Sequence, residues 1–374
     1  MRTILQKVAC LFVLFTFTVS CSERKMTSEE LFSQCASGVV LIMNEYYYVI
    51  HLPGGGELYF SDFDGENMVG LTAEQSEIMA NRNMLFGTGF FVSEDGKIMT
   101  NRHVAAPQID PAEVKKSYRS LVRAIRTIVE YRQMELSNQY DQLTAQIRNS
   151  TYYDFYGYAH TDYAAVSQLT AQQQNLSLQF SELEELKENL DMDVSELKIE
   201  SVCELGVAYN NTYVASEKDF KGCVVTKISD KDDIDLALIQ LKDKKTPATA
   251  HVFALPGQPE KEKGLWDKVK SVFGDDGKER KITVNEPLYM IGYNAGIQLA
   301  STSQGIKAQL TSGNVSQESD GVRLLYTIPT LGGSSGSPVV DEYGHLVAVN
   351  FAKVSNTQNF NFGIVAQQAA DFMK

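Results

Sequence analysis

The chain has 374 residues, of which 43% are hydrophobic and 22% are charged, and its formal net charge is −13 at pH 7. This composition is that of a globular protein long enough for one large domain or two smaller ones. The acidic balance argues against a nucleic-acid partner and against an electrostatic membrane anchor. No Cys/His spacing is typical of a zinc site, and we expect neither a metal nor a cofactor.

The first twenty residues are typical of a secretory signal peptide. Two basic residues precede the apolar run Val8–Val19, which is too short to cross a bilayer as a helix of the mature protein. The sequence Thr-Val-Ser-Cys at 18–21 resembles a bacterial lipobox, although Thr18 stands where the commonest form has leucine. We therefore expect an exported protein of the bacterial cell envelope, with a lipid on Cys21 as its only membrane attachment. Simple secretion without a lipid is the alternative.

Three cysteines remain after the signal: Cys35, Cys203 and Cys223. An exported protein can keep a disulfide, and Cys203 with Cys223 would close a short loop between two strand-like runs. Because three is an odd number, at least one thiol is unpaired, and the alternative is that all three are simply buried.

Outside a long helical segment, the sequence alternates short apolar runs with turn residues. An Asp95-Gly96 turn joins two of these runs as in a β-hairpin. Short strands at regular spacing predict an all-β sandwich or barrel. The strand-like runs are 39–43, 46–50, 86–92, 98–101, 202–209, 212–215, 223–228, 236–241, 288–292, 306–310, 322–328, 339–340, 346–351 and 361–365, and a closing helix is expected over 366–373.

Between residues 110 and 194 the pattern becomes that of two amphipathic helices. Asp110-Pro111-Ala112-Glu113 is a strong helix start, and apolar residues then recur every three or four positions. An aromatic turn at 152–158 separates this helix from a second apolar stripe at 166–190. We expect an antiparallel, coiled-coil-like hairpin of two helices of roughly 35 residues each, which serves a homo-oligomer or a partner protein. The predicted organisation is a signal peptide at 1–20, the first part of the β domain at 27–107, the helical hairpin at 108–196 and the remainder of the β domain at 197–374.

The loop Gly332–Pro338, Gly-Gly-Ser-Ser-Gly-Ser-Pro, is a candidate nucleophile site. Glycines on both sides of Ser335 let the backbone take dihedral angles that side chains forbid, and the proline fixes the entry into the next strand. Acyl transfer needs a nucleophilic oxygen beside converging backbone N–H groups. An ordinary Gly/Ser surface loop is the alternative interpretation.

A serine nucleophile needs a base, and the base needs a third group to orient it. His103 is the candidate base because it alone among five histidines follows a strand end in the context Gly-Thr-Gly-Phe-Phe-Val…Thr-Asn-Arg-His-Val. Asp235 abuts the apolar run 236–239, so it is the acid most readily carried into the interior, where a carboxylate needs a partner. Asp233 is the second choice. The other histidines, in turns, a connector or the hairpin, are His51, His160, His251 and His345.

Three blocks of this sequence resemble the catalytic blocks of trypsin-like serine proteases, and in particular those of the bacterial HtrA (Deg) type. The blocks are Gly-Thr-Gly-Phe-Phe-Val at 87–92 with Thr-Asn-Arg-His-Val at 100–104, Asp-Leu-Ala-Leu-Ile at 235–239, and Gly-Ser-Ser-Gly-Ser-Pro at 333–338. Their order along the chain also matches the family. With the strands at 286–293 and 344–349, the resemblance covers roughly residues 33–107 and 197–374.

The resemblance implies a mainly β fold of two six-stranded antiparallel barrels, with the helical hairpin as an insertion. It implies His103 as general base and acid, Asp235 as its orienting group and Ser335 as nucleophile, with the N–H groups of Gly333 and Ser335 as the oxyanion hole. The reaction implied is hydrolysis of peptide bonds through an acyl-enzyme, with proteins or peptides as substrates.

Several positions depart from the family pattern. Ser337 stands where the family usually has glycine, and no Ile-Val-Gly-Gly-type activated N-terminus is visible. Pro329 occupies the position, six before Ser335, that sets the primary pocket in the trypsin group, so cleavage after Lys or Arg is not expected. We expect no PDZ domain, and the helical hairpin is no part of the family pattern.

Together these features predict an exported serine endopeptidase. A non-catalytic or latent protease-fold module of the cell envelope, acting in binding or as a chaperone, is the alternative. The complete His-Asp-Ser set argues against it, because a non-catalytic scaffold has no physical need for all three groups.

Overall fold

The computed structural model describes residues 24–190, 193–257, 282–353 and 360–374. The predicted signal peptide and the predicted lipidation site at Cys21 lie outside these residues. The described residues divide into two compact units, the first within 1–46, 82–108 and 201–374 and the second within 47–81 and 109–200.

The first sheet closes into a six-stranded barrel. Its strands follow the order β1-β5-β6-β11-β10-β9, and a pairing of β1 with β9 closes the ring. Alternate residues point inward, and the interior contains Val40, Ile42, Phe91, Ile98 and Ile239. The strands are β1 Val39–His51, β5 Asn83–Phe91, β6 Lys97–Thr100, β9 Lys198–Tyr209, β10 Lys221–Ile228 and β11 Ala237–Leu241, and β2 Glu57–Phe60 extends the sheet beside β1.

The second sheet is a closed barrel in the order β12-β15-β16-β19-β18-β17. Leu288, Met290, Val315, Leu324 and Val339 are among the side chains that fill it. Its recorded strand pairs are all antiparallel. The strands are β12 Pro287–Gly292, β15 Gln309–Gln317, β16 Arg323–Tyr326, β17 Pro338–Val340, β18 Leu346–Lys353 and β19 Asn361–Val365. The prediction of two six-stranded antiparallel barrels is therefore confirmed.

A shared apolar cluster joins the two barrels. Leu41 and Phe90 of the first barrel and Ile291 and Val349 of the second belong to it. This packing joins the two barrels through one apolar core. Helices α2 Ser28–Cys35 and α9 Ala366–Met373 also contribute side chains to the cluster.

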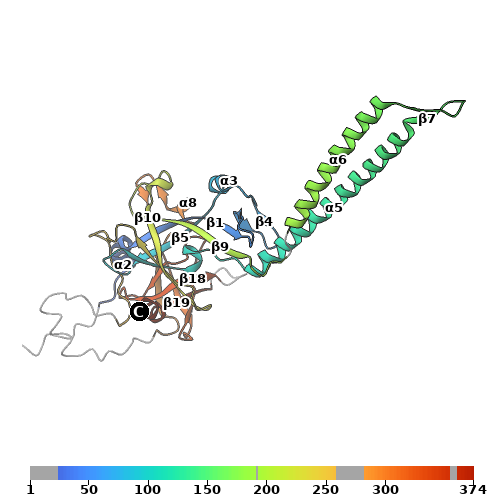
Figure 1. Ribbon diagram of the computed structural model, residues 1–374. Coiled ribbons are helices and arrows are strands. Elements are labelled where there is room, and N and C mark those ends of the chain that lie inside the picture. The colour runs from blue at the N-terminus through green and yellow to red at the C-terminus, as the bar shows by residue number, and fades with distance from the viewer. Residues whose placement is uncertain (1–23, 191–192, 258–281, 354–359) are drawn as a thin grey trace, which may run out of the picture. The chain divides into compact units, whose positions relative to one another are not determined.

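The second unit contains the expected helical hairpin (Figure 1), formed by α5 Pro111–Asn149 and α6 Tyr163–Asn189. The Asp110 carboxylate accepts a hydrogen bond from the N–H of Ala112, which caps α5 as the sequence predicts. At 27 residues, α6 is shorter than expected, because 151–161 form a small β-hairpin, β7 Thr151–Tyr153 with β8 Ala159–Thr161. None of the described helices is long and apolar enough to cross a membrane.

Short elements complete the described residues. They are η1 Ala36–Gly38, β3 Asp62–Phe63, β4 Met68–Val69, α3 Gln75–Ala80, α4 Arg102–Ala105, η2 Glu217–Asp219, α8 Ile297–Ala300, β13 Ser301–Thr302 and β14 Gly305–Ile306.

The predicted disulfide between Cys203 and Cys223 is not formed, and both residues are free thiols, as is Cys35. In the β9–β10 register Cys223 lies opposite Leu205, so Cys203 is diagonal to it. Diagonal Cβ atoms lie roughly 7 Å apart, whereas a disulfide needs about 4 Å. Burial raises the pKa of Cys35 and of Cys223 to about 12, and such thiols are unreactive.

Candidate active site

His103 lies on α4, a single helical turn directly after β6. The preceding Asn101 is fully buried, and so are Val104 and Ala105 on the inner side of the turn. The Asn44 amide donates hydrogen bonds to the carbonyl oxygens of Val104 and Ala105 at 2.9 and 3.3 Å. The turn is therefore held on its inner side, while the His103 side chain remains 42% exposed.

The structure brings His103 and Asp235 together. The His103 Nδ1 atom lies 2.5 Å from Asp235 Oδ2, and the His103 backbone N–H donates to Asp235 Oδ1 at 3.1 Å. A carboxylate at Nδ1 favours the tautomer with its proton there, which leaves Nε2 free to accept a proton. Asp233, the second choice of the sequence analysis, is exposed.

Two neighbours of His103 hold the segment that carries Asp235. Asn101 Nδ2 donates to the Asp235 carbonyl oxygen at 2.8 Å, and the Arg102 guanidinium donates to the carbonyl oxygens of Ser229 and Lys231 at 3.2 and 3.3 Å. No role for Asn101 or Arg102 is predicted from the sequence. Both residues directly precede His103 in the sequence, and this position is the signal that could have identified them. Polar groups that are carried into the interior need hydrogen-bond partners there.

Of the three serines in the loop, Ser335 is the one whose side chain is accessible. Ser334 is 2% exposed and its hydroxyl donates to the Leu331 carbonyl oxygen at 2.7 Å, while Ser337 is fully buried. Ser335 is only half-buried. The arrangement therefore leaves one hydroxyl available to an incoming substrate.

The serine loop belongs to the second barrel but binds the first barrel through Thr88 of β5. The Thr88 N–H donates to the Ser335 carbonyl oxygen, and the Thr88 hydroxyl donates to that of Gly333, both at 2.8 Å. Within the second barrel, the Gly336 N–H donates a hydrogen bond to the Asn350 backbone carbonyl oxygen at 2.8 Å. The two Thr88 bonds tie the loop to the barrel that carries His103.

Two positions in the loop require glycine. Gly333 has φ +95°, and a Cβ there would lie 2.4 Å from the Gly296 nitrogen. Gly336 has φ +86°, and a Cβ there would lie 2.1 Å from the Thr88 carbonyl oxygen. Both the left-handed backbone and the close approach therefore exclude a side chain.

The loop also leaves particular amides unused. The N–H groups of Ser334, Gly336 and Ser337 donate to backbone carbonyl oxygens. Within the described part of the chain, those of Gly333 and Ser335 donate to no acceptor. Two free N–H groups beside an accessible hydroxyl can bind a developing oxyanion.

The Ser335 hydroxyl itself makes no hydrogen bond to His103 among the described residues. The remaining histidines have other neighbours: His51 lies by Glu57, His160 by Asp154 and His345 by Asp341, and the His251 ring packs edge-on against Phe253. No group of three or more His, Cys, Asp or Glu side chains in the described ranges could hold a metal ion.

Residues 199–349 match the family model of the trypsin-like peptidase domain. The predicted resemblance is thus confirmed over a span that contains Asp235 and Ser335, while His103 precedes it. No curated protein sequence matches the chain. Among solved structures, the chain is similar to the serine endoprotease from Yersinia pestis, with 11% sequence identity and a TM-score of 0.40. The alignment covers 94% of this chain and 66% of that protein.

Proposed function

We propose that this chain is a serine endopeptidase that uses His103, Asp235 and Ser335. The observation that carries the proposal is the His103–Asp235 pair, with Nδ1 and Oδ2 2.5 Å apart. The accessible Ser335 hydroxyl lies on a loop bonded to the same barrel through Thr88. The trypsin-like peptidase match over 199–349 supports the same reaction class.

In the proposed mechanism, His103 Nε2 takes the hydroxyl proton as Ser335 Oγ attacks the carbonyl carbon of the peptide bond. Asp235 stabilises the imidazolium that forms. The oxyanion accepts hydrogen bonds from the Gly333 and Ser335 N–H groups. The imidazolium then protonates the leaving amine as the C–N bond breaks. A water molecule, deprotonated by His103, hydrolyses the acyl-enzyme, and the proton returns to Ser335.

The substrates proposed are proteins or peptides. Pro329 brings no carboxylate to the position that would recognise a basic side chain. We therefore propose no preference for cleavage after Lys or Arg.

A latent form of the same enzyme is a second candidate. It is favoured by the absence of a hydrogen bond between the Ser335 hydroxyl and His103 in the described structure. Catalytic contacts often tighten only when a substrate binds. In a latent enzyme, peptide binding to the loop would complete the triad.

The test is labelling of Ser335 by a fluorophosphonate, together with peptide hydrolysis. Ser335→Ala should abolish labelling and lower kcat by at least about 10³-fold, and Asp235→Asn should lower kcat by about 10⁴-fold. The matched control is Asp233→Asn, because this exposed acid neighbours Asp235 without contacting His103.

Hydrolysis that survives Ser335→Ala would exclude the proposal. Labelling that requires an added peptide would establish the latent form, and no labelling under either condition would indicate a non-catalytic module.

We further propose that the protein is exported and anchored by a lipid on Cys21. The support is the signal-like pattern at 1–20 and the lipobox-like sequence at 18–21. Mass spectrometry of the mature N-terminus should find a diacylated Cys21 as the first residue. An unmodified cysteine or a different first residue would refute the anchor.

A further inference from the structure

The helical hairpin leaves an unusual amount of apolar surface uncovered. More than half of the large apolar side chains exposed by the described residues lie between 111 and 189. The buried residues of α5 end at Leu136, and α6 has none. A helix that buries none of its residues is marginal in water unless another surface covers it.

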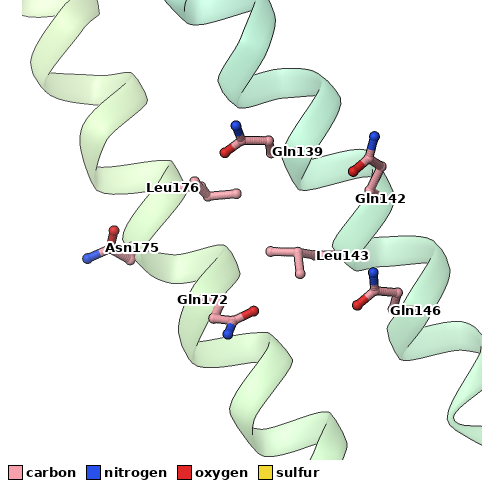
Figure 2. Close-up of a pocket in the computed structure, with 7 residues that line it drawn as sticks. All are labelled: Gln139, Gln142, Leu143, Gln146, Gln172, Asn175 and Leu176. Atoms are coloured by element: carbon pink, nitrogen blue, oxygen red, sulfur yellow. The ribbon is translucent and has the colours of Figure 1, made fainter.

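Two grooves flank the contact line between α5 and α6. One has a volume of about 370 Å³, and Figure 2 shows its polar rim of Gln139, Gln142, Gln146, Gln172 and Asn175 around Leu143 and Leu176. The other has about 260 Å³ and is lined by Leu136, Ser137, Tyr140, Leu176, Ser177, Phe180 and Ser181. Leu136 and Tyr140 lie one turn apart on the same side of α5. Ser137 and Gln139 project to opposite sides of these two residues, so the two grooves lie on opposite faces of the hairpin.

We call the second groove and the α5 residues beside it, Met134, Asp141, Thr144 and Arg148, the serine face. Its small side chains let another helix approach closely. Tyr140 and Phe180 remain 40% and 39% exposed within it, which provides apolar area to bury. The glutamine side chains rim the opposite face.

The distal part of the hairpin carries few charges, and their placement is informative. Residues 136–181 contain four ionised side chains: Asp141, Arg148, Asp154 and Asp162. Asp154 and Asp162 accept hydrogen bonds from backbone N–H groups of the turn and of the α6 cap. Asp141 and Arg148 are exposed and form no ion pair with any described residue. Seven positions apart on α5, they share one face.

We propose that the serine face binds a second copy of this chain across a two-fold axis, with the two α5 helices antiparallel. An axis between Thr144 and Ala145 places Asp141 of each copy opposite Arg148 of the other. The interface is then isologous, so one surface supplies both members of each ion pair. This arrangement pairs Asp141 with Arg148, neither of which forms an ion pair with any described residue of its own chain.

The same axis gives the aromatic tip of the hairpin a partner. Tyr152, Tyr153, Phe155, Tyr156 and Tyr158 are 62–97% exposed. At 1.5 Å per helical residue and about 3.3 Å per strand residue, the tip lies roughly 15–25 Å from the axis. Tyr131 and Met134, which are 59% and 54% exposed, lie about 16–20 Å from it on the other side. Each tip therefore reaches the exposed apolar residues of the other copy.

A second copy fits this surface better than a membrane does. An anionic lipid surface attracts Lys and Arg, and residues 149–163 contain neither. Two copies with a formal charge of −13 each repel one another, and residues 136–181, with three Asp and one Arg, contribute only −2 of this charge. The basic residues Lys115, Lys116, Arg119, Arg123 and Arg126 lie nearer the start of α5, outside the proposed overlap.

Charge reversal in the mature full-length chain tests the proposal, with sedimentation over a concentration series as the readout. The unmodified chain should dimerise. Asp141→Arg or Arg148→Asp alone turns both ion pairs into like-charge pairs and should raise the dimer Kd at least about tenfold. The double variant D141R/R148D should return to within about threefold of the original Kd. An equimolar mixture of the two single variants should form heterodimers, because their charges are complementary.

The matched controls are Gln139→Arg and Gln146→Asp, which place the same charges at the same spacing on the opposite face. They should leave the Kd unchanged, and circular dichroism should show that all variants keep their helices.

A chain that stays monomeric up to about 100 μM, a double variant that fails to recover, or a dimer lost in the glutamine variants would overturn the proposal. Binding of a monomeric chain to phosphatidylcholine vesicles, lost in Phe155→Ser, would assign the tip to a membrane instead. Because this proposal is independent of the peptidase activity, fluorophosphonate labelling of every variant should be unchanged.

Discussion

Gly332 and Gly333 are neighbours in the serine loop, but the backbone makes different demands on them. A Cβ on Gly332 would meet no atom within 4 Å, whereas a Cβ on Gly333 would lie 2.5 Å from the Tyr293 carbonyl oxygen. Gly333 also has φ +95°. Its free N–H is one of the two proposed oxyanion donors, so its conformation serves both the fold and the chemistry.

Gly333→Ala and Gly332→Ala should therefore differ sharply. The left-handed conformation and the clash together should cost Gly333→Ala about 2–4 kcal/mol of unfolding free energy. Relief of the clash would move the N–H, and kcat should fall about 10²-fold or more. Gly332→Ala should change both quantities little. Urea unfolding and peptide kinetics measure the two effects, and equal behaviour of the variants would contradict the proposed role of Gly333.

At the same scale, some site residues were accessible to sequence reasoning and others were not. The sequence favours Asp235 over Asp233 because Asp235 abuts an apolar run, and the structure places its carboxylate at His103. Thr88, which bonds to Gly333 and Ser335, lies more than 200 positions away in sequence. The pairing of two separately closed barrels brings these residues together, and no local pattern contains that information.

At the scale of elements, periodicity and capping residues predicted α5 well. They did not predict the β7–β8 hairpin, because the aromatic segment has no apolar alternation. Its turn is instead held by the Asp154 carboxylate, which accepts from the N–H groups of Tyr156 and Tyr158, both at 2.9 Å. The disulfide prediction failed for a related reason: spacing along the chain does not determine strand register, and the observed register puts Leu205 opposite Cys223.

For the whole molecule, the division into units differs from the boundaries suggested by composition. Residues 47–81 group with 109–200 rather than with the rest of the first barrel. Tyr47, Val49, Tyr59 and Ile78 form a small core in this unit. The buried face of α5 begins at Val114, near the helix start. The segment of α5 from Val114 to Leu136 therefore belongs to a folded unit, and we expect that the distal hairpin, residues 137–180, can be removed.

Two deletions should separate these roles. Leu136 and Ser181 line the same groove, so a Gly-Ser linker of about five residues can replace 137–180. This shortened chain keeps the buried side chains of α5, and we expect its melting temperature and its kcat/KM on a small peptide to stay close to those of the full chain, with kcat/KM within about threefold. It should be monomeric where the full chain is dimeric.

Deletion of 110–194 instead removes that buried face and exposes the apolar surface it covers, which should lower the melting temperature and promote aggregation. Calorimetry measures the melting temperature of the two variants, sedimentation their oligomeric state and peptide kinetics their kcat/KM. Loss of peptidase activity in the shortened chain would place the distal hairpin in the catalytic unit, whereas a stable, active 110–194 deletion would show that α5 contributes nothing to the fold around it.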